Sequence, residues 1–137
     1  MASIRKEISL EASPDQVWDA VRDVSAVHQR LAPGFVTDTR LDGDARIVTF
    51  ANGAVVRELL VDRDDTARRL AYSVVDSPMK MTHHHATIQV VPDGAHQSRM
   101  IWIADVWPNE AAEHVGAMME QGSRVMARTL NAAKSEV

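Results

Sequence analysis

Residues 109–133, NEAAEHVGAMMEQGSRVMARTLNAA, decide the fold of this chain. Their apolar residues recur every three or four positions, which predicts one long helix with a single apolar stripe. The stripe consists of Ala111, Ala112, Val115, Met118, Met119, Val125, Met126, Leu130 and Ala133. Asn109 follows Pro108 and is the expected N-cap. About 24 residues span roughly 36 Å, so we expect the rest of the chain to wrap this helix.

Seven strands are predicted before the long helix, separated by turn signals such as Asn52-Gly53 and Pro92-Asp93-Gly94. They cover residues 4–11, 35–41, 46–50, 54–63, 69–75, 82–91 and 97–106. Between the first two strands, Ser13-Pro14-Asp15-Gln16 has the pattern of a capping box and predicts a helix start. A second short helix is predicted over residues 25–31.

This order of elements predicts an α+β fold. No segment of helix length separates the last six strands, so the sheet is expected to be antiparallel. Its apolar face needs a partner, and the long helix is the one available. Small residues along that helix, including Gly122, favour a hollow rather than a solid interior. A mid-helix glycine costs about 1 kcal/mol against alanine, and here it would leave space for a ligand.

Composition excludes several classes of function. A chain of 137 residues fits one domain, and the absence of cysteine excludes thiolate metal sites and cysteine nucleophiles. A net charge of −4 without a basic stripe argues against nucleic-acid binding. The sequence has no membrane-length apolar run and no signal core, so a cytoplasmic protein without a membrane partner is expected. No nucleotide-binding or zinc-hydrolase motif occurs, and no cofactor is expected.

The histidine run His83-His84-His85 lies in a predicted strand, where neighbouring side chains alternate between faces. The alternation places His84 with Ala86 on the apolar, inward face, and His83 with His85 on the polar face. Two histidines at i and i+2 could share a metal ion, but no third ligand is set by spacing. We therefore predict no metal site.

Several segments, in order, resemble the START-like superfamily of helix-grip proteins, particularly the polyketide cyclase/dehydrase branch. They are Ala12-Ser13-Pro14-Asp15-Gln16-Val17-Trp18-Asp19-Ala20-Val21, Arg57-Glu58-Leu59-Leu60-Val61 with Asp64-Asp65, Arg68-Arg69-Leu70-Ala71-Tyr72-Ser73, Thr82-His83-His84-His85-Ala86, Trp102-Ile103-Ala104-Asp105 through Pro108, and Met119-Glu120-Gln121-Gly122. The resemblance covers nearly the whole chain. It implies one helix-grip domain over residues 1–137, with a seven-stranded curved sheet, two short helices after the first strand and a ligand cavity under the long helix.

The resemblance also implies which strand faces line the cavity. Glu58 would point inward, together with Val56 and Leu60. In the strand at 97–106, the family pattern favours the face of Asp105 as the inner one. The alternative is that Trp102 packs under the helix and Asp105 is solvated, and the two readings carry equal weight. An exposed Trp102 face would suggest a homodimer.

Three functional interpretations stay open, and the third is an interaction or chaperone-like module with a mostly filled core. In the first, Glu58, His84 and Asp105 act as acid–base groups of a cyclase or dehydratase, since burial shifts their pKa values toward neutrality. In the second, the protein is a non-catalytic carrier or sensor of a small, largely apolar organic ligand. The expected ligand-lining residues are Val56, Leu60, Tyr72, Met81, Ala86, Ile101, Ile103, Trp107, Val115, Met118, Gly122 and Met126.

Overall fold

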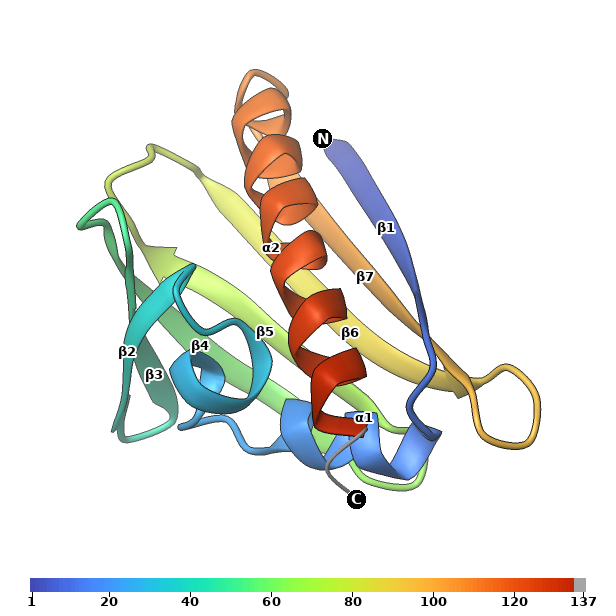
Figure 1. The fold of residues 1–137 in the computed structure, drawn as a ribbon. Coiled ribbons are helices and arrows are strands. Elements are labelled where there is room, and N and C mark those ends of the chain that lie inside the picture. The colour runs from blue at the N-terminus through green and yellow to red at the C-terminus, as the bar shows by residue number, and fades with distance from the viewer. Residues whose placement is uncertain (135–137) are drawn as a thin grey trace.

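The computed structural model describes residues 1–134 as a curved antiparallel sheet that grips one long helix (Figure 1). The element order confirms the predicted fold class. The strands are β1 (Ala2–Leu10), β2 (Val36–Asp42), β3 (Ala45–Phe50), β4 (Val55–Asp64), β5 (Arg69–Asp76), β6 (His83–Pro92) and β7 (Ser98–Trp107). The helices are α1 (Pro14–Arg22), a five-residue π-helix η1 (Val27–Leu31) and α2 (Ala111–Lys134).

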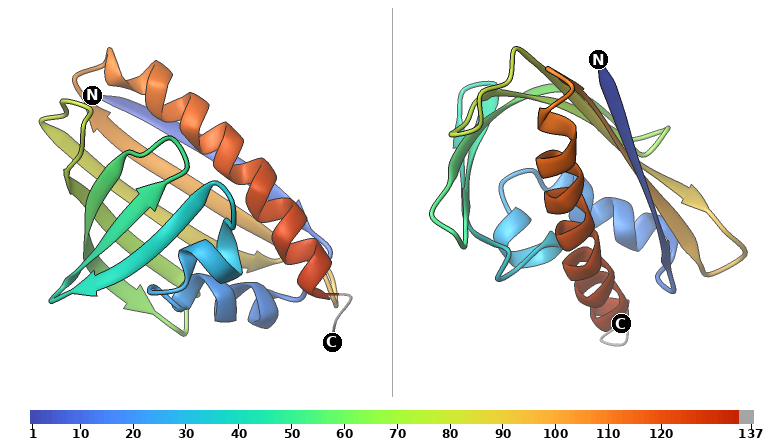
Figure 2. Two further views of the ribbon diagram at one scale, coloured as in Figure 1. Left: turned by 60° about the vertical axis from the view of Figure 1, so that its left-hand side comes forward. Right: turned by 90° about the horizontal axis from the view of Figure 1, so that it is seen from above.

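All seven strands form one sheet in the order β1-β7-β6-β5-β4-β3-β2, with every neighbouring pair antiparallel. The sheet curls around α2, as the view from above shows (Figure 2). Strand β4 shifts register at Arg57/Glu58 and again at Leu60/Asp62, and β2 shifts near Val36. Such irregularities bend a strand and increase its twist, which helps these strands curve around the helix.

The helix α1 begins as the sequence predicts. Ser13 is its N-cap, and the side chains of Ser13 and Gln16 each accept a hydrogen bond from the other residue's main-chain N–H. The helix α2 begins at Ala111, two residues later than predicted. Its first N–H groups donate to the main-chain oxygens of Pro108 and Asn109. Within residues 1–134, no helix is both long enough and apolar enough to cross a membrane.

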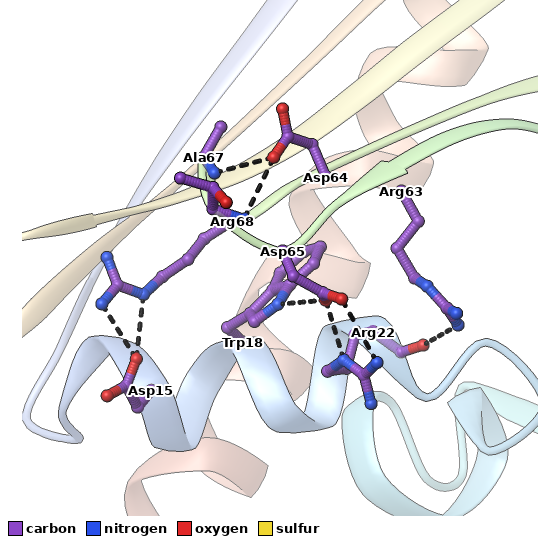
Figure 3. Close-up of polar contacts among 9 residues, drawn as sticks. Asp15, Trp18, Arg22, Arg63, Asp64, Asp65, Ala67 and Arg68 are labelled. Carbon is purple, nitrogen blue, oxygen red and sulfur yellow. Dashed lines mark hydrogen bonds and ion pairs between the residues drawn. The ribbon is translucent and has the colours of Figure 1, made fainter.

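The turn between β4 and β5 is attached to α1 by a polar cluster (Figure 3). Asp65 accepts hydrogen bonds from Trp18 Nε1 at 3.0 Å and from Arg22 Nε at 2.9 Å. Arg68 donates to Asp15 at 2.9 Å. These contacts hold α1 across the end of the sheet at which the β4–β5 turn lies.

Candidate functional site

A cavity lies between α2 and the inner face of the sheet. Its walls are mainly apolar, and its empty space is about 770 Å³ when the open mouth is included. The lining residues are Phe35, Phe50, Asn52, Ala54, Val56, Glu58, Tyr72, Val74, Ser77, Pro78, Met79, Met81, His84, Trp102, Ala104, His114, Val115, Met118 and Met119. The lining includes residues of the β3–β4 turn, of the β5–β6 connection and of the N-terminal part of α2. These three segments lie toward the same end of the molecule (Figure 1), and we place the mouth between them.

A buried ion pair stands at the polar part of the cavity. Arg46 Nε on β3 donates to Glu58 Oε1 on β4 at 2.7 Å, and the two side chains are only 5% and 10% exposed. The Arg46 guanidinium lies over the Tyr72 ring, 5.3 Å from its centroid. Its Nη1 also donates to the Val24 main-chain oxygen at 3.4 Å. The pair compensates two charges that would otherwise be costly to bury.

Tyr72 and Trp102 form a second buried polar contact. The indole Nε1 of Trp102 donates to the Tyr72 hydroxyl oxygen at 3.0 Å. Burial raises the pKa of Tyr72, and the Glu58 carboxylate raises it further. The phenol is therefore protonated at neutral pH. Its oxygen accepts from Trp102 Nε1, while its own proton has no acceptor within residues 1–134.

His84 stands where strands β5 and β6 separate. Their paired register ends at Tyr72 and Ala86, and beyond it the Val74 N–H donates to His84 Nδ1 at 3.0 Å. The Ser73 hydroxyl donates to the His84 main-chain oxygen. Burial, together with the charges of His85 and His83, lowers the pKa of His84 to about 4. Because Nδ1 accepts in this neutral ring, the ring proton lies on Nε2.

Seven predicted residues line the cavity: Val56, Glu58, Tyr72, Met81, His84, Val115 and Met118. Leu60, Ala86 and Met126 lie on the inner side among core residues but outside the cavity lining. The predicted faces of β4 and β6 are therefore confirmed, because Glu58 and His84 are buried while His83 is exposed.

The predicted inner face of β7 is wrong. Met100, Trp102, Ala104 and Val106 are buried under the helix. Asp105 shares the outer face with Ile101, Ile103 and Trp107, and none of these four residues lines the cavity. The register supplies the reason, since Asp105 pairs with His85 and Ala104 with Ala86. Directly opposed residues share a face, so Asp105 cannot join Glu58 and His84. Buried Trp102 also removes the basis for the suggested homodimer.

Gly122 does not widen the cavity, in contrast to the prediction. A Cβ atom at this position would lie 3.2 Å from the Phe35 ring and 3.4 Å from the Trp102 ring. The missing side chain instead allows two aromatic rings to approach the helix. Gly122 thus allows close packing of α2 against the rings of Phe35 and Trp102.

Sequence reasoning did not select Arg46, Phe35, Phe50 or His114, although Arg46 closes the ion pair and the others line the cavity. Packing of Trp102 under the helix was one of its two alternatives for β7, and the structure confirms that alternative. One signal for Arg46 was available, since it alternates with the apolar residues Val48 and Phe50 on β3. A charged residue in that pattern needs a buried partner. His83 and His85 lie toward the outer face, and residues 1–134 contain no group of three or more His, Asp or Glu arranged to hold a metal ion.

The fold and cavity define a helix-grip protein of the START-like superfamily. Residues 1–137 match the model of the family described as polyketide cyclase / dehydrase and lipid transport. The chain belongs to this family. Comparison with curated protein sequences finds no match.

Solved structures from several organisms have this fold. An uncharacterised protein from Bacillus thuringiensis is 20% identical, with 94% of this chain and 98% of that chain covered and a TM-score of 0.85. A START superfamily protein from Mycobacterium smegmatis is 12% identical, with 98% and 97% covered and a TM-score of 0.73. Norcoclaurine synthase from Thalictrum flavum is 22% identical, with 99% and 87% covered and a TM-score of 0.75. At these identities the likeness concerns the fold.

Proposed function

We propose that this protein binds one small, largely apolar organic molecule in the cavity between α2 and the sheet. One observation carries the proposal: an open, mainly apolar cavity with a few buried polar groups gathered in one part of it. Ligand sites of proteins commonly combine apolar walls with a few placed polar groups. The family description, which includes lipid transport, supports the same reading.

The arrangement favours a carrier or sensor over an acid–base enzyme. Asp105 lies on the outer face of the sheet, so the expected set of three acid–base groups is not assembled. Glu58 is paired with Arg46, so one of its carboxylate oxygens already accepts a hydrogen bond from a guanidinium group. His84 has a pKa of about 4, far from the neutral range that suits a general base.

Binding can be tested with N-phenyl-1-naphthylamine, an uncharged apolar dye whose fluorescence rises in apolar surroundings. Ala54 lines the cavity and is partly exposed, so Ala54→Trp should fill the mouth without disturbing the core. Val55, its neighbour, is 51% exposed and lies outside the lining, so Val55→Trp is the matched control. We expect wild type and Val55→Trp to bind the dye and Ala54→Trp to bind at least about tenfold more weakly. Equal binding by both variants, or none by wild type, contradicts the proposal.

A catalytic role for Glu58 stays a prediction with its own test. Turnover of a linear polyketone by wild type, lost in a folded Glu58→Gln variant that still binds the dye, would favour the cyclase interpretation. Binding of the polyketone without conversion would favour the carrier. Asp105→Asn is the control in both cases, since Asp105 does not line the cavity.

A further inference from the structure

We infer that the cavity selects an uncharged ligand with a carbonyl-type oxygen, which accepts hydrogen bonds from the Tyr72 hydroxyl and from His84 Nε2, and that it rejects carboxylates. This inference rests on the proposed function, because it names the class of ligand for the same cavity. It follows from the hydrogen-bond directions and charges of four buried residues.

The first donor is the Tyr72 hydroxyl. The residue is 5% exposed and lines the cavity. Its oxygen already accepts a hydrogen bond from Trp102 Nε1 at 3.0 Å. A hydroxyl has one proton to donate, and no contact within residues 1–134 uses it. The indole therefore turns the phenol into a donor toward the cavity.

The second donor is the Nε2–H group of His84. The Val74 main-chain N–H occupies Nδ1 at 3.0 Å, which excludes a proton there. The Tyr72 and His84 ring centroids are 5.9 Å apart, and both residues line the cavity. Two neighbouring donors suit one carbonyl oxygen, which has two lone pairs.

The distribution of charge excludes an anion. Glu58 is the one Asp, Glu, Lys or Arg among the lining residues of the described chain. The nearest cation, Arg46, has its Nε on Glu58 and its Nη1 on the Val24 carbonyl oxygen. A ligand carboxylate would lose its hydration and meet no free Lys or Arg side chain in exchange.

A cationic ligand is disfavoured by the same groups. The two free donors present their positive ends to the cavity, and the charge of Glu58 is offset by Arg46. An ammonium group needs acceptors, and it would have to compete with the Arg46 guanidinium for the same carboxylate. A neutral acceptor is the group that satisfies Tyr72 and His84 without leaving a buried charge unpaired.

Four naphthalenes of similar shape separate these possibilities in displacement of N-phenyl-1-naphthylamine from wild type. They are 2-acetylnaphthalene, 2-ethylnaphthalene, 2-naphthoate and 1-(2-naphthyl)ethylammonium. We expect the ketone to bind at least about tenfold tighter than the ethyl compound, because two hydrogen bonds are gained. Both ions should bind at least about tenfold more weakly than the ketone.

Variants assign the effect to the donors. Tyr72→Phe should reduce the preference for ketone over ethylnaphthalene several-fold while binding of the ethyl compound persists. His84→Met should act likewise. His84→Gln should retain the preference, since the glutamine oxygen can accept from the Val74 N–H while its NH₂ group donates to the ligand. Far-ultraviolet circular dichroism checks the fold, and the histidine pair decides the question if Tyr72→Phe does not fold.

Each outcome has a definite reading. Equal affinity for ketone and ethylnaphthalene, or naphthoate binding as tightly as the ketone, overturns the inference and leaves the proposed function standing. Failure of the dye to bind wild type overturns the proposed function itself. If His84→Gln loses the ketone preference as His84→Met does, a donor group at this position does not restore the preference. That result would overturn the role of His84 as a hydrogen-bond donor.

Discussion

The Nε atom of Arg46 lies 2.7 Å from Oε1 of Glu58, and neither side chain is more than 10% exposed. Arg46↔Glu58 is a directly opposed pair on β3 and β4, so both side chains enter the interior from the same level of the sheet. Each charge depends on the other, because within residues 1–134 neither side chain forms another ion pair.

Removal of one partner of this pair should destabilise the protein strongly. Arg46→Met leaves Glu58 as an unpaired buried carboxylate, which costs about 3–5 kcal/mol. The free energy of unfolding from urea titration measures the loss. The double variant Arg46→Met/Glu58→Met should recover most of it. Arg57→Met is the control, because its Asp42 partner is exposed, and it should change stability little. A small effect of Arg46→Met would contradict the importance of the pair.

His84 should make stability depend on pH between about 6.5 and about 4. Its pKa is about 4 in the folded protein, against an ordinary value of 6.5. As pH falls through this window, the unfolded chain takes up a proton and the folded protein does not, so stability falls. Below about 4 both states are protonated and the loss stops. One group with this shift accounts for about 3 kcal/mol.

The measurement for His84 is the difference between wild type and His84→Gln in urea unfolding at several pH values. The difference removes the contribution of carboxylates that titrate near pH 4. The wild type should lose more stability than the variant as pH falls from 6.5 to 4. Parallel curves would show that burial of His84 does not set this dependence.

Gly122 should not tolerate a large side chain. In Gly122→Leu the Cβ alone would approach Phe35 at 3.2 Å and Trp102 at 3.4 Å. Overpacking of this kind costs about 1–3 kcal/mol, and we expect it to exceed the gain of about 1 kcal/mol from removing a mid-helix glycine. Thermal unfolding should show a lower midpoint. Ala117→Leu, on the exposed side of the same helix, should leave it nearly unchanged.

The capping box of α1 should contribute measurably to stability. Ser13 Oγ accepts from the Gln16 N–H at 3.3 Å, and Ser13→Ala removes this acceptor. Loss of an N-cap costs about 1 kcal/mol. Urea unfolding measures it, with Ser9→Ala on the exposed side of β1 as the control. Equal stability of the two variants would mean that the Gln16 side chain alone sustains the helix start.

Local patterns were sufficient for the elements and for the inner face of β6, while the inner face of β4 followed from the family resemblance. The turn signals predicted each strand to within two residues of its bounds. The Ser13–Gln16 capping box predicted the start of α1. On β6, small and apolar residues alternate with polar ones, so the inward position of His84 could be predicted. On β7, Ile101 and Ile103 are as apolar as Met100 and Trp102, and the alternation carried no information about the inner face.

The sequence by itself determined a seven-stranded antiparallel sheet, two short helices and a long amphipathic helix, because these depend on short-range periodicity and turn chemistry. Only the tertiary structure decided the site. Pairing of Ala104 with Ala86 places Asp105 on the outer face of the sheet. Pairing of Arg46 with Glu58 gives this predicted acid–base group a buried ion-pair partner. Approach of Phe35 and Trp102 to the helix filled the space at Gly122. These outcomes depend on register and packing between strands distant in sequence, which no local pattern specifies.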